Sequence, residues 1–171
     1  MDWDRRGFPY PVLPITVNSY GRNLIRHQGT PMTPSQILAI EAEADEDPPG
    51  PQPWRCFQLG ASVARAAVRS PLRVALVASS SWSHSFLVSK HAGMYADVES
   101  DRRFYEAFKA GDWDVWRNVT IEEAEDRGHH ELLNWFCLAG AMAELGRKPD
   151  YSVFQESWIT NSDKVFAAFR P

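Results

Sequence analysis

The chain has 171 residues, 44% of them apolar, which is enough for a single domain with a buried core. Its formal net charge of −4 gives no electrostatic basis for binding nucleic acid or an anionic membrane. No apolar stretch approaches the roughly 18 residues that a membrane-spanning helix needs, and residues 1–6 lack the apolar core of a signal peptide. We therefore expect a soluble, cytoplasmic protein with one domain over residues 1–171.

The N-terminal half predicts a strand, a polar excursion, a helix and a second strand. Residues 11–18 are β-branched and apolar, and their prolines favour a short strand near a sheet edge. Residues 27–53 are polar and proline-rich, which indicates a surface excursion with a helical turn or two around 35–43. A helix is expected from Pro53, where proline suits the first turn, to before Pro71. The continuous apolar run 73–78 then has the length and composition of a buried sheet strand.

Three helices with clear start or stop signals follow. Asp97 can cap a helix that ends at Gly111, and Thr120 with Glu123 three residues later forms a capping box. The pattern resumes over residues 128–146, which carry a long series of apolar side chains.

The C-terminal tail offers two β-like stretches, residues 151–159 and 164–169, separated by turn-forming residues 161–163. Helical and strand patterns alternate along the chain without an internal repeat. The predicted fold class is α/β, a layered sheet flanked by helices.

His84 is the first candidate for chemistry. It follows the apolar run 73–78 in a serine-rich loop, and functional groups in open α/β sheets gather where strands end. A histidine there can act as a general acid or base, because its usual pKa near 6.5 leaves both protonation states available. The alternative is a loop histidine that is hydrogen-bonded to its serines. A serine hydrolase is a weaker alternative, since no acidic residue is evident to orient the histidine.

Glu131 is the second candidate, because the dozen residues after it are almost entirely apolar. A carboxylate near such a face is costly unless it is paired, hydrogen-bonded or bound to a metal. The alternative is a glutamate in the first turn of a helix, where its charge complements the helix dipole.

The remaining candidates are weaker. His129 and His130 do not have the spacing of a zinc helix, and we interpret them as surface groups or as supports behind the site. Lys90 and His91 follow the His84 loop, where they could reach an anionic substrate group. Aromatic residues near the two candidates could line a pocket, although core packing is the more common role of such residues; they are Trp82, Phe86 and Trp135.

These motifs, taken in order, resemble the class III extradiol ring-cleavage dioxygenases, the family of the protocatechuate 4,5-dioxygenase catalytic subunit. The resemblance runs from Arg73 to Pro171, and 14–20 and 54–68 fit the family's middle portion. It rests on the run 74–78 with Ser83-His84, on Asp101-Arg102-Arg103-Phe104, and on Glu131-Leu132-Leu133-Asn134-Trp135 followed by Ala139-Gly140-Ala141.

The resemblance implies non-haem Fe(II) held by two histidines and one glutamate, a catechol-type diol and O₂ as substrates, and a role in aromatic compound catabolism. By motif match, Glu131 is the expected metal ligand and His84 the acid/base. We also assign Ser83, Trp82, His91 and Asn18 as candidate substrate-binding residues.

The family's two histidine ligands lie upstream of the region that matches residues 11–18, and His27 has no family-like context. The expectation is therefore an incomplete iron site. A truncated dioxygenase that is inactive alone is one explanation, and a separate chain or a homo-oligomer that supplies histidines is another. The third is a non-catalytic subunit or interaction module derived from this family.

Overall fold

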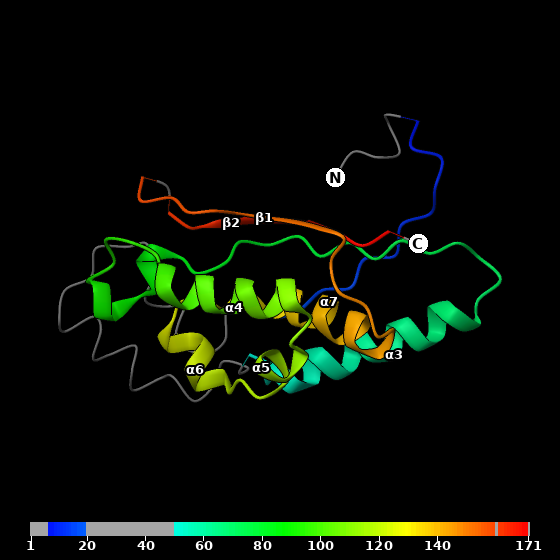
Figure 1. The fold of residues 1–171 in the computed structure, drawn as a ribbon, viewed down its shortest axis with the longest axis horizontal. Coiled ribbons are helices and arrows are strands. Elements are labelled where there is room, and N and C mark those ends of the chain that lie inside the picture. The colour runs from blue at the N-terminus through cyan, green and yellow to red at the C-terminus, as the bar shows by residue number, and fades with distance from the viewer. Residues whose placement is uncertain (1–6, 20–49, 160, 171) are drawn as a thin grey trace.

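The computed structural model describes residues 7–19, 50–159 and 161–170, and within these ranges the protein is a layer of helices covered by a β-hairpin (Figure 1). The elements are α3 (Pro53–Arg69), the 3₁₀ turns η2 (Ser85–Leu87) and η3 (Ser89–His91), α4 (Val98–Ala110), α5 (Trp113–Arg117), α6 (Ile121–Asp126), α7 (Leu133–Glu144), β1 (Tyr151–Gln155) and β2 (Lys164–Ala168). The predicted mixed α/β class is confirmed.

Helices α3 and α7 form the closest helix pair because each presents a glycine at the crossing. A Cβ atom added at Gly60 would lie 1.7 Å from the carbonyl oxygen of Cys137, and one at Gly140 would lie 1.9 Å from that of Phe57. Side chains larger than hydrogen therefore cannot fit at either position without separating the helix axes.

The core between the helices and the hairpin is aromatic. Its rings meet mostly edge to face, the arrangement that the ring quadrupole favours. Trp82, which comes from the loop before η2, is fully buried, with its ring centroid 5.8 Å from that of Trp116 and 5.5 Å from that of Trp135. The other large side chains that are fully buried here include Phe104, Phe108 and Phe136. The loop that carries His84 is thus fixed to the core by its own tryptophan.

The predicted C-terminal hairpin is confirmed. Strands β1 and β2 pair antiparallel from Tyr151 opposite Ala168 to Gln155 opposite Lys164, and Phe154 on the inner face approaches Trp82. The first strand ends at Gln155, four residues before the expected end, because the chain from residue 156 turns away into the connection that contacts the His84 loop.

The capping residues predicted for the helices are confirmed at three helix ends. The Asp97 carboxylate accepts a hydrogen bond from the Ser100 N–H, Gly111 ends α4 with a φ of +76°, and the Thr120 hydroxyl accepts from the Glu123 N–H. The short helix α5 was not predicted. The excursion at 27–53 lies largely outside the described residues, as does the helical turn expected at 35–43.

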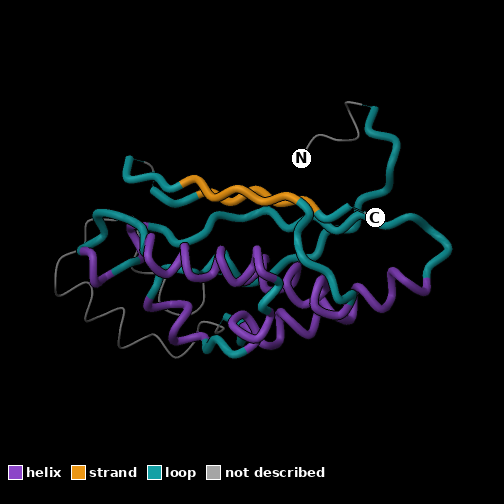
Figure 2. The backbone as a smooth tube through the Cα atoms, viewed as in Figure 1, coloured by secondary structure: helices purple, strands orange, loops and turns teal. Residues whose placement is uncertain are grey.

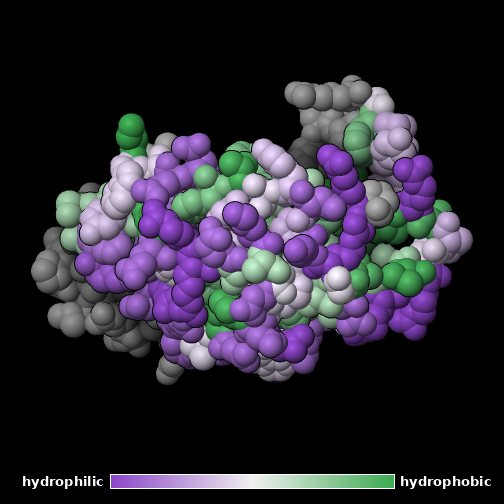
Figure 3. Space-filling model, in the orientation of Figure 1, coloured by the Kyte–Doolittle hydropathy of each residue, from purple (hydrophilic) through white to green (hydrophobic). Residues whose placement is uncertain are grey.

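The two strands predicted at 11–18 and 73–78 are wrong. Both segments are extended, but neither is paired with another strand of the described residues (Figure 2). A strand exists only where a neighbour satisfies its backbone groups, and apolar composition alone cannot supply that neighbour. Instead of being buried, residues 73–77 are exposed, and Val77 is 81% exposed. Hydrophobic surface is visible where this segment leaves α3, at the right of Figure 3.

Candidate active site

The loop that carries His84 is held by hydrogen bonds to two distant segments. The His84 N–H donates to the Gly128 carbonyl at 3.1 Å, and the Ser85 N–H donates to the Asn161 carbonyl at 2.8 Å. The Ser85 hydroxyl donates a hydrogen bond to Asn161 Oδ1 at 2.6 Å, and His84 forms an isolated antiparallel β-bridge with Ser162. The connection between β1 and β2 and the turn before α7 therefore both fix the backbone of His84.

Glu131 lies in a tight turn rather than in a helix. The predicted helix over 128–146 begins only at Leu133, because residues 128–132 form turns in which the Leu132 N–H donates to the His129 carbonyl. Glu131 thus precedes α7 instead of lying in its first turn, and its carbonyl accepts a hydrogen bond from the Asn134 N–H. Its Oε2 atom accepts a hydrogen bond from the Ser81 N–H at 3.2 Å.

Gly128 lets this turn approach the His84 loop. Its φ is +68°, and an added Cβ would lie 2.9 Å from the His84 carbonyl oxygen and 2.9 Å from Val88 Cγ2. Both the backbone conformation and the space therefore require glycine.

We expect Gly128→Ala to destabilise the protein by about 2–4 kcal/mol, the sum of left-handed backbone strain and overpacking. Gly146→Ala is the matched control, since Gly146 has a φ of +63° but nothing within 4 Å of the added atom. Urea denaturation of both variants measures the difference. Equal loss of stability in the two variants would show that the turn at Gly128 is not in close contact with the His84 carbonyl.

His84 and Glu131 converge, although they are 47 residues apart in the sequence. His84 Nε2 lies 3.9 Å from Glu131 Oε2, too long for a direct hydrogen bond and short enough for charge interaction. The imidazole side chain is 9% exposed and the carboxylate side chain 24% exposed. Burial lowers the pKa of His84; Glu131 opposes this shift and Lys164 adds to it. The ring is therefore neutral at pH 7 and able to accept a proton.

His129 and His130 are both buried, so the first of their two predicted roles, surface groups, is wrong, and the alternative of supports behind the site stays a prediction. His129 Nε2 lies 2.7 Å from Asp101 Oδ1, with both side chains fully buried. Burial lowers the pKa of His130 to about 4. Sequence reasoning missed these positions because it placed both residues on a helix, whereas the turn directs them inward.

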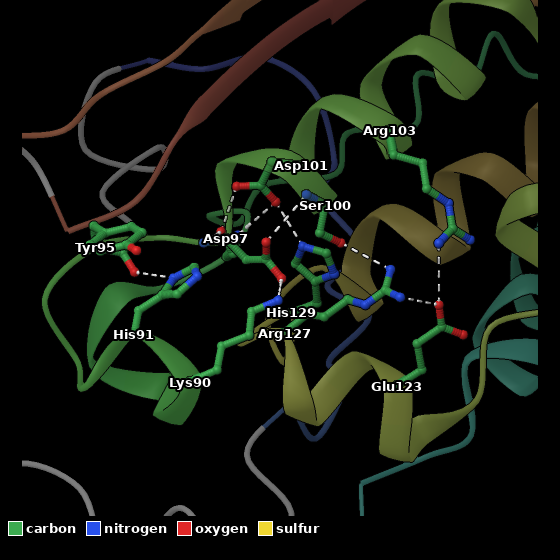
Figure 4. A network of polar contacts seen from close by, with 11 residues as sticks. Lys90, His91, Tyr95, Asp97, Ser100, Asp101, Arg103, Glu123, Arg127 and His129 are labelled. Atoms are coloured by element: carbon green, nitrogen blue, oxygen red, sulfur yellow. Dashed lines mark hydrogen bonds and ion pairs between the residues drawn. The ribbon is translucent and has the colours of Figure 1, made fainter.

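A cluster of polar side chains surrounds Asp101 at the start of α4 (Figure 4). Its members link α4, α6, the η3 turn and the segment before α7. In the sequence, Asp101 stands out only as part of the motif Asp101-Arg102-Arg103-Phe104. The contacts that hold the cluster together include Lys90 with Asp97, Arg127 with Ser100 and Glu123, and His129 with Asp101.

The structure gives the other predicted site residues the following surroundings. Trp82 is a core residue, and Ser83 is fully buried against Asp101. His91 stacks on Tyr95 with ring centroids 4.0 Å apart. Asn18 is exposed in the extended segment 7–19. Phe86, by contrast, places its ring 5.2 Å from that of His84 and is 42% exposed, so it is the aromatic side chain best placed beside the pair.

The described residues do not form a complete set of metal ligands. Across residues 7–19, 50–159 and 161–170, no group of three His, Cys, Asp or Glu side chains is placed to hold one. The candidate pair itself offers one carboxylate and one imidazole, with Glu131 Oε2 and His84 Nε2 3.9 Å apart. A complete Fe(II) site does not fit these residues alone.

Comparison with known families decides the relationship. Residues 47–167 match the family model described as the catalytic LigB subunit of aromatic ring-opening dioxygenase. The chain belongs to this family. No curated protein and no solved structure gave a significant match.

The match covers His84 and Glu131 and leaves out residues 7–19, which include Asn18. It confirms the predicted resemblance at the level of the aromatic ring-opening dioxygenase family, over residues 73–167 of the expected stretch. Membership makes an aromatic ring-opening dioxygenase the kind of protein to which this chain is related.

Among the described helices, none combines the length and apolar composition that a bilayer crossing requires.

Proposed function

We propose that this member of the LigB family contributes to opening catechol-type aromatic rings with O₂ at a non-haem Fe(II) centre. Glu131 supplies one carboxylate ligand to that centre, and His84 supplies the acid/base. The protocatechuate 4,5-dioxygenase-like subgroup is part of the same proposal. The observation that carries it is the convergence of Glu131 and His84 at 3.9 Å within the matched region.

The described residues support the roles of the two side chains in different ways. The Ser81 N–H fixes Oε2 of Glu131, so the carboxylate keeps one orientation. Burial keeps His84 neutral, which lets it accept a proton from a diol hydroxyl and return that proton later. Phe86 provides an exposed ring edge beside His84. Fe(II), when bound, supplies the redox chemistry with O₂.

The remaining ligands have to come from outside the described residues, either from the rest of this chain or from a second polypeptide or a second copy. This requirement also favours a second candidate function, a non-catalytic subunit or interaction module. The exposed apolar segment 73–77 supports that alternative, because such a surface is typical of interaction sites.

An anaerobic Fe(II) titration of the full chain tests the proposal, with 4-nitrocatechol as an optical probe of a bound diol. We expect Glu131→Gln to weaken iron binding at least ~10-fold, because losing a ligand should cost no less than losing a group that only supports a ligand. Glu122→Gln, an exposed carboxylate in α6, is the control and should bind like the wild type.

Catalytic turnover separates the two candidates. If the chain opens catechol, His84→Gln should lower kcat by about 10²–10⁴-fold, the usual contribution of an acid/base. Iron binding that does not depend on Glu131 would overturn the assignment of this ligand. The absence of any iron binding would favour the interaction module.

A further inference from the structure

We infer that Asp101 is a positioning residue for His84 and acts through Ser83. The Ser83 N–H donates to Asp101 Oδ1 at 3.2 Å, and the Ser83 hydroxyl donates to Asp101 Oδ2 at 2.6 Å. Both residues are fully buried. One carboxylate thus binds the backbone and the side chain of the residue immediately before His84.

Ser83 is also bound from the other side. Its hydroxyl oxygen accepts a hydrogen bond from the Asp97 N–H at 2.9 Å, which ties it to the N-cap of α4. The next residue, His84, donates its N–H to Gly128. With residue 83 held by α4 and residue 84 held by the turn before α7, little freedom remains in the backbone that directs the imidazole toward Glu131.

Asp101 is itself fixed by several groups. His129 Nε2 lies 2.7 Å from its Oδ1 atom, and the Asp101 N–H donates to the Asp97 carbonyl within the first turn of α4 (Figure 4). A buried carboxylate with three donated hydrogen bonds near a helix N-terminus is well compensated. Because His129 lies two residues before Glu131, Asp101 connects the segment that carries the acid/base with the segment that carries the carboxylate.

The importance of Asp101 for catalysis rests on the acid/base role proposed for His84, whereas its control of the imidazole position does not. A test of position is therefore needed that works without metal or substrate. Carbethoxylation of His84 by diethyl pyrocarbonate at pH 7, followed by mass spectrometry, reports how well the ring is held and covered. His91, which contacts neither Ser83 nor Asp101, is the internal reference.

We expect Ser83→Ala and Asp101→Asn to raise the modification rate of His84 several-fold relative to His91. Hydrogen exchange at the Ser81 amide, which binds Glu131, should quicken in the same variants. Thr120→Ala is the control for general loosening, since it removes the N-cap of α6 without touching the His84 loop, and it should leave both rates unchanged.

An unchanged His84 rate in a folded Asp101→Asn protein would overturn the inference, and so would an equal increase in Thr120→Ala. If Asp101→Asn fails to fold, Ser83→Ala decides by the same criterion, because it retains the backbone hydrogen bond to Asp101.

The activity arm separates this inference from the proposed function. If the protein opens catechol, Ser83→Ala should lower kcat and leave KM nearly unchanged, since it disturbs proton transfer rather than diol binding. If no preparation shows iron-dependent ring opening, the proposed function fails, and the His84 modification rates still decide whether Asp101 positions the ring.

Discussion

Replacing Gly140 with alanine should destabilise the protein by about 2 kcal/mol or more, although alanine is the better helix former by about 1 kcal/mol. The added methyl group would lie 1.9 Å from the Phe57 carbonyl oxygen and 2.6 Å from the carbonyl carbon. These are backbone atoms of α3, which cannot rotate away as a flexible side chain can. The helices α3 and α7 must separate, and the aromatic core loses contacts along their length.

Thermal and urea denaturation measure this effect. Ala143→Ser is the control in the same helix, because Ala143 lines a surface cleft of about 330 Å³ between α3 and α7, where one added oxygen has room. Gly60→Ala should behave like Gly140→Ala, since its Cβ would lie 1.7 Å from the Cys137 carbonyl oxygen. Unchanged stability of both glycine variants would contradict the close packing of these helices.

The second large effect concerns Asp163, a fully buried carboxyl in the connection between β1 and β2. Its Oδ1 atom accepts a hydrogen bond from the Ser157 N–H at 2.8 Å, and its Oδ2 atom has no hydrogen-bond partner among the described residues. Burial raises the pKa of Asp163 from 3.8 to about 7, and the neighbouring Asp101 carboxylate adds to the rise. The protonated form can donate to Asp101, whereas the ionised form repels it.

The folded state therefore binds more protons than the unfolded state between about pH 4 and pH 7. The free energy of unfolding should fall as the pH rises through this window, by up to about 4 kcal/mol at roughly 1.4 kcal/mol per pKa unit. Asp163→Asn keeps an acceptor for Ser157 and places an N–H donor against Asp101 at every pH. The variant should thus be more stable than the wild type at pH 8, and the difference should shrink toward pH 4.

Urea denaturation of both proteins from pH 4 to pH 8 checks this, and subtracting the two curves removes the contributions of titrating groups that do not interact with Asp163. Asp126→Asn, at an exposed position at the end of α6, is the control and should track the wild type. Parallel curves for Asp163→Asn and the wild type would show that Asp163 does not hold a proton in the folded state.

Sequence predicted best those features that depend on near neighbours in the chain. The caps at Asp97 and Thr120, the stop at Gly111 and the C-terminal hairpin all follow from residues within a few positions of one another. The strands expected at 11–18 and 73–78 failed because pairing depends on a distant partner. Composition carries no information about whether that partner is present.

The candidate site shows the same division. His84 and Glu131 were selected by composition and by the family resemblance, and their convergence depends on Gly128, whose role is evident only from the approach of two distant loops. The contact between Asp101 and Ser83 spans 18 residues and joins different elements, so no local pattern could reveal it. His129 lies against the same carboxylate, 28 residues away in the chain, and that contact is likewise not evident from a local pattern.

The exposed run from Arg73 to Val77 has a consequence for handling the protein. Extended apolar backbone without a partner strand among the described residues is a template on which another chain can add a strand. Because residues 73–77 are exposed on both faces, no buried face fixes the register of such pairing. Segments of this composition, uncharged between Arg73 and His84, are the ones from which ordered aggregates grow. If the protein precipitates at high concentration and Val77→Lys reduces this precipitation, the insolubility arises from the exposed segment 73–77 and not from misfolding of the helical core.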